Sequence, residues 1–283
     1  MTRILGTVLA LCCLVAVGPT PSVAAAEPGD LPAFTQVQAP SVSGVRRYGH
    51  RLVVSPGRWS PTPATTRYQW YRDGQPLAGD TTRVRDIRPG DVGHRLAVRV
   101  SVTHPTRTPA SSVVQLGVVK HRVDTRRVVR YSVRTKGRVP ASLATFKTLA
   151  QQTYDDPRGW RGRGVRFVRV ASGGAFTLWL SEAGRVPGFS SVCSAQWSCR
   201  VGRNVVINVQ RWQHASPAWN RAGRSLRDYR HMVVNHETGH WLGKGHASCS
   251  RRGALAPVMQ QQSKGTQGCR FNPWPTLAEL RRP

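Results

Sequence analysis

Three histidines and one glutamate have the residue types and the spacing of a metal site. The segment reads His236-Glu237-x-x-His240-x-x-Gly243-x-x-His246. Neutral imidazole is a common ligand of divalent transition metals, and zinc often takes nitrogen ligands in tetrahedral sites. Four residues advance a helix by about 400°, so on a helix His236 and His240 would lie one turn apart on the same face. Both imidazoles could then reach one metal ion.

The other residues of this motif have separate expected roles. Glu237 lies about 100° around the helix from His236, which suits a general base beside a metal-activated water better than a third ligand. Gly243 permits the left-handed backbone that ends a helix, and the turn would return His246 as the third ligand. The fourth position would be left for water. The alternative is an ordinary helix with solvated histidines, but this composition would give the five residues at this spacing by chance about once in 100,000 cases.

A helix that begins after Ser225 is expected to carry the motif. Ser225 and Asp228 nearly form a capping box, and Tyr229, Met232 and residues 233–234 supply a buried side. Upstream, Pro140 is expected to open another helix, in which apolar residues recur at helical spacing.

Strands are expected around these two helices. The pattern predicts them at residues 128–133, 165–170, 176–180 and 204–209. The order of strand, helix, three strands and helix predicts an α+β domain over residues 127–283.

The extended motif resembles the signature of the metzincin clan of zinc metallopeptidases. The resemblance implies a twisted mixed sheet with an active-site helix, one catalytic zinc ion, and a methionine turn under the zinc, for which Met259 is the candidate. It also implies an endopeptidase that hydrolyses peptide bonds of a peptide or protein substrate by a zinc-activated water, with Glu237 as general base. A strand at the cleft would pair with an extended substrate, and residues 204–209 are the best candidate for that strand.

A narrower resemblance covers the chain from about residue 127 to its end. Residues 233–243 and 256–262 are similar to those of a family of uncharacterised exported actinobacterial proteins. That family's reaction is itself inferred from the motif, so the resemblance supports fold and metal more than substrate. Gln261 stands where some metzincin subgroups have a zinc-binding tyrosine, and Ala247 replaces a polar residue. We therefore expect three histidine ligands and no further protein ligand.

Residues 37–118 consist of short predicted strands and turns. Residues 95–102 alternate apolar and polar side chains, which is typical of a half-buried antiparallel strand. Further strands are expected at residues 51–54 and 67–71, followed by a tight turn at Asp73-Gly74.

Three segments here resemble bacterial immunoglobulin-like repeats: Gly57-Arg58-Trp59, Tyr68-Gln69-Trp70-Tyr71-Arg72-Asp73-Gly74 and Asp91-Val92-Gly93-His94-Arg95-Leu96. The resemblance implies an all-β sandwich with Trp70 in its core, which serves as a spacer or a surface-binding module. Residues 117–126 would link it to the second domain.

Residues 1–26 have the layout of a secretory signal peptide, with Arg3, an apolar run over residues 4–17 and three alanines before Glu27. An uncleaved membrane anchor is the alternative, but the run is shorter than the roughly 18 to 20 residues that a spanning helix needs. We expect a secreted, extracellular or cell-surface protein with no membrane span in the mature chain.

Four cysteines remain after the signal peptide: Cys193, Cys199, Cys249 and Cys269. An even set in an exported chain indicates two disulfides. Three pairings are possible, and proximity favours Cys193 with Cys199 and Cys249 with Cys269. A four-cysteine zinc site is the alternative, although the irregular spacing argues against it. No cysteine lies between Glu27 and Cys193, so latency through a thiol switch is not expected.

The net charge of +29 arises from 42 basic and 13 acidic residues. Such a charge could favour anionic partners, but the arginines are spread along the chain and no nucleic-acid recognition motif accompanies them. We expect no specific nucleic-acid partner. The alternative function is an exported protein that binds cell wall or polyanions and has a structural zinc site. Glu237 argues against it, because this residue is neither a ligand nor apolar.

Overall fold

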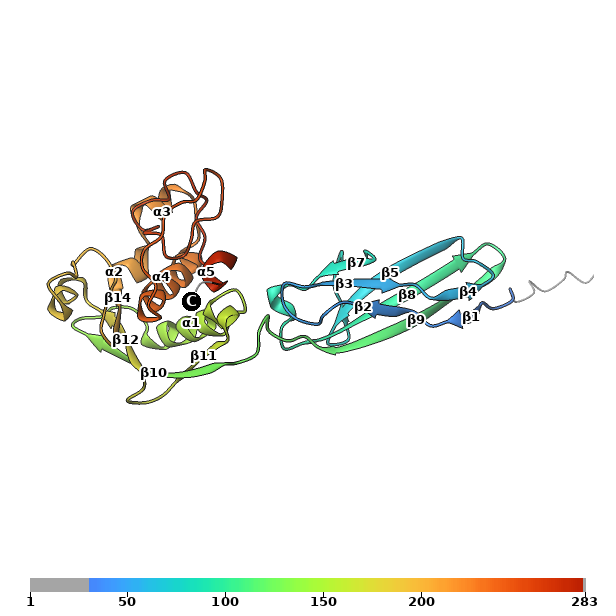
Figure 1. Cartoon of the computed structure of the whole chain (residues 1–283), viewed down its shortest axis with the longest axis horizontal. Helices are drawn as coiled ribbons and strands as arrows, with labels where there is room; N and C mark the ends of the chain where they lie inside the picture. Colours follow the sequence, from blue (N-terminus) through green and yellow to red (C-terminus); the bar gives the residue numbers. More distant parts are fainter. Residues whose placement is uncertain (1–30, 282–283) are drawn as a thin grey trace, which may run out of the picture.

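The chain forms two parts that lie end to end in the computed structural model, which describes residues 31–281 (Figure 1). The first part is built of strands and turns, and the second mixes strands with helices. Each part has its own hydrophobic core. The expected mixture of α and β structure is confirmed, whereas the signal-peptide prediction for residues 1–26 lies outside the described residues.

Two antiparallel sheets share one core in the first part. The first sheet contains β2 (Ser41–Ser43), β3 (Arg51–Ser55) and β7 (Val84–Asp86). The second contains β6 (Gln75–Pro76), β5 (Thr65–Arg72), β8 (Arg95–His104) and β9 (Arg107–Val118), in that order. A separate pair joins β1 (Thr35–Gln38) to β4 (Arg58–Ser60).

The alternation predicted for β8 is confirmed. Its apolar residues at positions 96, 98, 100 and 102 are fully buried, while Arg95 and Arg99 are exposed. Trp70 on β5 lies in the same core, and its indole nitrogen donates to the carbonyl of Thr82 at 2.9 Å. The sequence did not predict β9, because Pro109 and the small residues after it interrupt the apolar pattern.

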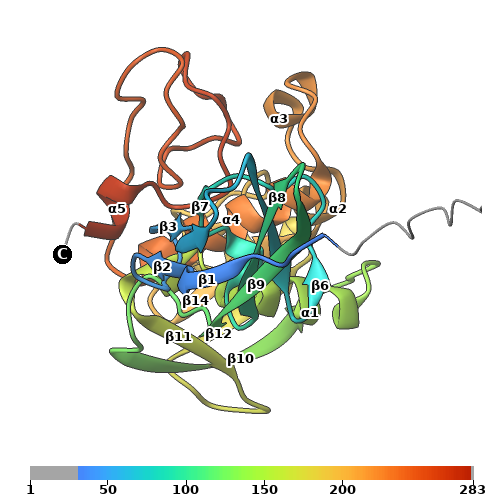
Figure 2. The same ribbon diagram turned by 90° about the vertical axis from the view of Figure 1, so that its right-hand side faces the viewer.

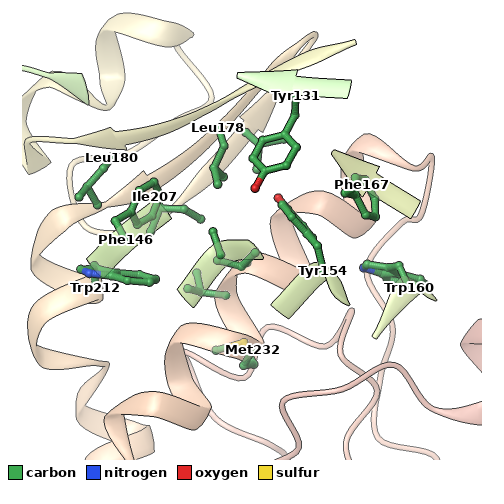
Figure 3. Packing of buried hydrophobic residues seen from close by; sticks show 14 of the residues in the cluster. Tyr131, Phe146, Tyr154, Trp160, Phe167, Leu178, Leu180, Ile207, Trp212 and Met232 are labelled. Atoms are coloured by element: carbon green, nitrogen blue, oxygen red, sulfur yellow. The ribbon is translucent and has the colours of Figure 1, made fainter. Parts of the chain in front are cut away.

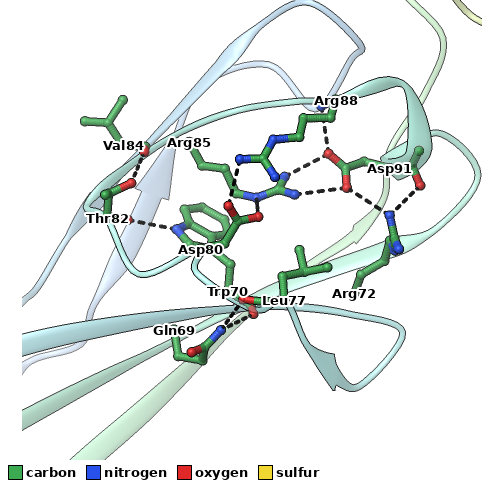
Figure 4. A network of polar contacts seen from close by, with 11 residues as sticks. Gln69, Trp70, Arg72, Leu77, Asp80, Thr82, Val84, Arg85, Arg88 and Asp91 are labelled. Atoms are coloured by element: carbon green, nitrogen blue, oxygen red, sulfur yellow. Dashed lines mark hydrogen bonds and ion pairs between the residues drawn. The ribbon is translucent and has the colours of Figure 1, made fainter.

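A buried charge cluster closes one side of this core (Figure 4). The guanidinium of Arg85 binds both carboxylate oxygens of Asp91 at 2.9 and 3.0 Å, and its Nε donates to Asp80 at 3.1 Å. Arg88 adds a second contact to Asp80 at 2.8 Å. The side chains of Arg85 and Asp91 are 3% and 1% exposed, so each charge depends on its partners in place of water.

The second part is organised on a five-stranded sheet of order β11-β10-β12-β14-β13. Its strands are β10 (Arg127–Lys136), β11 (Val165–Arg169), β12 (Phe176–Ser181), β13 (Cys199–Val201) and β14 (Asn204–Asn208). Pairing is parallel throughout except between β13 and β14, which form a short antiparallel hairpin.

The place of β14 corrects one prediction. Residues 204–209 were expected to border the cleft, but β14 lies inside the sheet between β12 and β13. The edge strand is β13, a three-residue strand too short to be recognised from its sequence. The helix expected to open at Pro140 also begins later, because Ser142 caps it by accepting the amide of Thr145 at 3.2 Å.

Helices cover one face of the sheet. They are α1 (Leu143–Asp155), α2 (Val209–His214), α3 (Pro217–Arg221), α4 (Leu226–Trp241) and α5 (Leu277–Arg281). The helices α1 and α4 pack against each other, and the long loops after α4 lie on its far side from the sheet (Figures 1 and 2). None of the helices within residues 31–281 is long and apolar enough to cross a membrane.

Aromatic side chains fill the space between sheet and helices (Figure 3). Tyr154 of α1 stacks on Phe167 of β11 with ring centroids 4.4 Å apart, and Phe146 meets the edge of Trp212 at 4.7 Å. Such pairs add to the hydrophobic gain of burial. Phe176 of β12 also meets Trp241 of α4 with ring centroids 4.8 Å apart, so aromatic packing connects α4 to the sheet.

Removing Asp91 should destabilise the first part strongly. Asp91→Ala would leave Arg85 buried beside Asp80 alone, and breaking a buried ion pair in this way costs about 3–5 kcal/mol of unfolding free energy. Urea unfolding followed by tryptophan fluorescence measures the change. The control is Asp86→Ala, since Asp86 pairs with Arg51 at the surface and its loss should have little effect. Equal stability of the two variants would contradict this account.

Candidate metal centre

Helix α4 carries the first two histidines, as predicted. The hydroxyl of Ser225 accepts the amide of Asp228 at 3.0 Å and caps the helix start. Tyr229 and Met232 are buried in the main core, and they lie on the same side of α4 as His236 and His240, which follow at helical spacing. Met232 also lines a pocket, so this packing sets the rotation of α4 that turns His236 and His240 toward that pocket.

The helix ends at the predicted glycine. Gly243 has a φ of +84°, its amide donates to the carbonyl of His240 at 3.1 Å, and the amide of Lys244 donates to the carbonyl of Gly239 at 2.9 Å. These two bonds form a Schellman cap, which favours glycine at the left-handed position. The chain reverses there and brings His246 back to the helix.

The three histidines converge on one point. The Nε2 atom of His240 lies 3.2 Å from the Nε2 atoms of both His236 and His246. The other nitrogen of two of the rings faces a backbone carbonyl: Nδ1 of His236 meets Val258 at 2.8 Å, and Nδ1 of His240 meets Lys244 at 2.8 Å. A carbonyl can only accept, so Nδ1 carries the proton and Nε2 presents a lone pair.

This geometry fits a metal ion. Neutral imidazoles whose lone pairs face one another at 3.2 Å repel unless a cation lies between them. Two nitrogen ligands of a tetrahedral zinc ion stand about 3.3 Å apart, from bond lengths near 2.0–2.1 Å. Among the described residues, His236, His240 and His246 form the group of potential ligand side chains that lie close enough together to hold one metal ion.

Burial keeps the imidazoles neutral. It lowers the pKa of His236 to about 3, with a smaller effect from His240. Burial also lowers the pKa of His240 and of His246. The charge of Arg200 lowers the pKa of His240 further, and the charge of Lys264 lowers the pKa of His246. Neutral imidazole is the form that binds metal, so no proton has to leave at neutral pH.

Glu237 lies beside the three histidines in the same pocket. Its side chain is buried, and burial raises the pKa of the carboxyl to about 8. A general base must start as the carboxylate, which is the form that a cation held by the three histidines would favour.

Met259 lies under the helix, as predicted for a methionine turn. Its side chain is buried against Gly239, where a Cβ would clash with the sulfur and would lie 2.8 Å from the ring of Trp160. The carbonyl of Met259 accepts the amide of Ala247, the residue after His246, at 3.1 Å. The turn therefore contacts both the helix and the returning loop.

Glu279 of α5 holds this turn in place, and the sequence did not point to it. Its carboxylate accepts the amides of Val258 and Met259 at 3.1 and 2.8 Å. It also accepts the amide of Thr276 at 2.7 Å, which completes a capping box at the start of α5. The Thr276-x-x-Glu279 spacing could have predicted the helix start, but not the contact to residues 258–259.

Both favoured disulfides are present. Cys249 pairs with Cys269 and closes the loop that contains Met259. Cys193 pairs with Cys199 at the start of β13, and this pair lines the pocket. One disulfide therefore ties the segment under the metal centre, and the other ties its wall.

The pocket over the metal centre has a volume of about 740 Å³. Its floor is α4, one wall is formed by residues 192–200, and the other by residues 261–264. Gln261 lies in that second wall, and Lys264 Nζ donates to its side chain at 3.4 Å. Sequence analysis did not identify Arg200, because its role depends on the β13–β14 hairpin.

Replacing Gly239 should loosen the turn under the metal centre. Gly239→Ala places a methyl group against Met259 and Trp160, and overpacking of this kind costs about 1–3 kcal/mol. Thermal unfolding and metal affinity should both fall. The control is Gly184→Ala, at an exposed glycine with ordinary backbone and open space around its Cβ position. A Gly239→Ala variant as stable as this control would show that the close contact is unimportant.

Comparison with known proteins gives a family but no relative of known activity. A search of curated proteins finds no match. The family described as "Protein of unknown function (DUF3152)" matches residues 101–276, from within β8 to the start of the capping box of α5. This range is more than half of the chain and includes every residue of the metal centre except Glu279. The chain belongs to this family.

Proposed function

We propose that this protein is a secreted zinc-dependent endopeptidase of the metzincin type. The observation that carries the proposal is the convergence of three imidazole nitrogens beside a buried carboxylate in an open pocket. A purely structural zinc site would be closed by four protein ligands and would not need Glu237. The left-handed turn at Gly243 and the turn of Met259 under the helix support the metzincin assignment.

The residues of the chain divide the reaction between them. His236, His240 and His246 would hold the zinc ion, whose Lewis acidity polarises the scissile carbonyl and lowers the pKa of water. Glu237 takes the proton of the attacking water and passes it to the leaving amine. The burial of Glu237 excludes bulk water from the transfer.

The edge strand β13 is the proposed partner of the substrate backbone. One side of β13 pairs with β14, and among the described residues no strand pairs with its other side. An extended peptide could add there as a further strand, directly beside the pocket. Backbone pairing of this kind tolerates many side chains.

Other features support the secreted location and the role of the first part. Two disulfides suit an extracellular protein. The two facing sheets of the first part suit an immunoglobulin-like sandwich, which would serve as a spacer or contact the cell wall. The bidentate pair of Arg47 with Asp124, at 3.0 and 2.8 Å, ties the segment before β10 to the first part.

Metal content is the first test. The purified protein should hold about one zinc ion per chain, and His240→Ala should lose it, because two ligands cannot replace three. His214→Ala, at an exposed histidine outside the pocket, is the control and should keep the metal. Elemental analysis decides the matter. Wild-type protein without zinc, or a His240→Ala variant with the full amount, would refute the site.

The role of Glu237 is the second test. Glu237→Gln should keep zinc and fold but reduce peptide hydrolysis by roughly 100 to 10,000-fold, the usual contribution of general-base catalysis. Cleavage is measured on a diverse peptide mixture by product sequencing, with a chelator as the blank. Full activity of the variant would contradict the mechanism. Zinc binding without any cleavage by wild type would favour a cell-wall or polyanion-binding protein with structural zinc.

A further inference from the structure

The charges that line the pocket are unbalanced. Arg200 and Lys264 are basic side chains of its two walls, whereas Glu237 is the one acidic side chain among its described lining residues. Glu237 is engaged at the metal centre, so its charge is not available to the far wall. A positive pocket wall favours an anionic group on the molecule that binds there.

The register of β13 directs Arg200 toward this pocket. Arg200 pairs with Val205, whose side chain is buried in the main core on the helical face of the sheet. Its neighbours Cys199 and Val201 pack on the opposite face with Val206. Side chains alternate along a strand, so Arg200 faces α4 and lines the pocket beside His240.

Arg200 has no acidic partner within residues 31–281, and its Nε is buried without a hydrogen-bond acceptor. Arg85 binds Asp91, and Arg158 binds Asp156 at 2.7 Å. The Nε atoms of Arg107 and Arg122 also lack an acceptor, but neither residue lines the pocket. An unsatisfied buried donor is costly, and in a binding site the missing acceptor can come from the ligand.

We propose that Arg200 forms a subsite for a carboxylate of the peptide substrate, next to the scissile bond. This inference rests on the proposed peptidase function. A guanidinium binds a carboxylate with two parallel hydrogen bonds, which gives both energy and direction. The carboxylate belongs either to an acidic side chain or to the C-terminus of the peptide. Lys264, at the rim of the opposite wall, strengthens the attraction without fixing its geometry.

Cleavage of matched peptides tests the subsite in the zinc-loaded protein. A glutamate is moved through each position around the scissile bond, with glutamine at the same position as the reference. At one position, glutamate should raise kcat/KM by roughly tenfold to a hundredfold, the range of a hydrogen bond to a charged group. Amidated and free C-termini separate the two sources of the carboxylate. An equal rate for every pair would overturn the proposal.

Variants assign the preference to Arg200. Arg200→Gln should remove the preference for glutamate, and Arg200→Glu should reverse it toward lysine at the same position. Arg200→Lys should keep part of it, because the charge remains but the two-bond geometry is lost. The control is Arg134→Gln, which removes an exposed arginine from the other face of the same sheet. A preference that survives in Arg200→Gln, or that falls equally in Arg134→Gln, would refute the assignment.

Binding separates this inference from the peptidase function. Fluorescence anisotropy measures the Kd of labelled glutamate and glutamine peptides on Glu237→Gln protein, with and without Arg200→Gln. Tighter binding of the glutamate peptide that depends on Arg200 supports the subsite, even if wild type cleaves nothing and the peptidase proposal fails. Efficient cleavage with no such difference in Kd or kcat/KM supports the peptidase and rejects the subsite.

Discussion

The site of the three histidines depends on one turn, residues 258–259, and on the carboxylate of Glu279 that holds it. Both amides of the turn donate to Glu279, so their carbonyls are free to face the helix. The carbonyl of Val258 orients His236, and the carbonyl of Met259 binds the amide next to His246. One carboxylate therefore fixes the backbone that positions two of the three histidines. His240 is oriented separately, by the cap that ends its own helix.

The segment around this turn has little regular structure to stabilise it. Within residues 249–270 the chain forms turns and one isolated bridge, between Leu255 and Arg270. Side chains replace the missing ladder: Gln262 donates to two carbonyls and accepts the amide of Asn272, and Asn272 donates to the carbonyl of Ala256. The disulfide closes the same loop, which should add roughly 3 kcal/mol in the chain-entropy model. Covalent and polar contacts thus stabilise the segment under the histidines, where regular strands and helices are lacking.

The sequence predicted those parts of the site that follow from local rules. The helix spacing placed His236 and His240 on one face, and the cap rule placed the turn at Gly243. It did not predict the edge strand β13 or the contact of Glu279 with the turn, because both depend on pairing between distant segments. Residues 204–209 were predicted to border the cleft because the sequence did not reveal the additional strand beside them. Strand order is a property of the whole sheet. The sequence gives no sign of β13, so it does not reveal that β14 has a neighbour on both sides.

The excess of arginine acquires its meaning only from the structure. With 13 acidic residues, the chain cannot pair most of its arginines with carboxylates. Several lie instead over aromatic rings, such as Arg127 over Trp241 at 5.3 Å and Arg230 over Trp212 at 4.7 Å. A guanidinium can stack in this way because it is planar and weakly hydrated. Stacking on aromatic rings and contact with solvent therefore accommodate many of the arginines, and the net charge of the chain says little about its partners. Arg200 differs because it faces the pocket without a ring or a carboxylate of its own, so the position of one arginine is more informative than the sum of all of them.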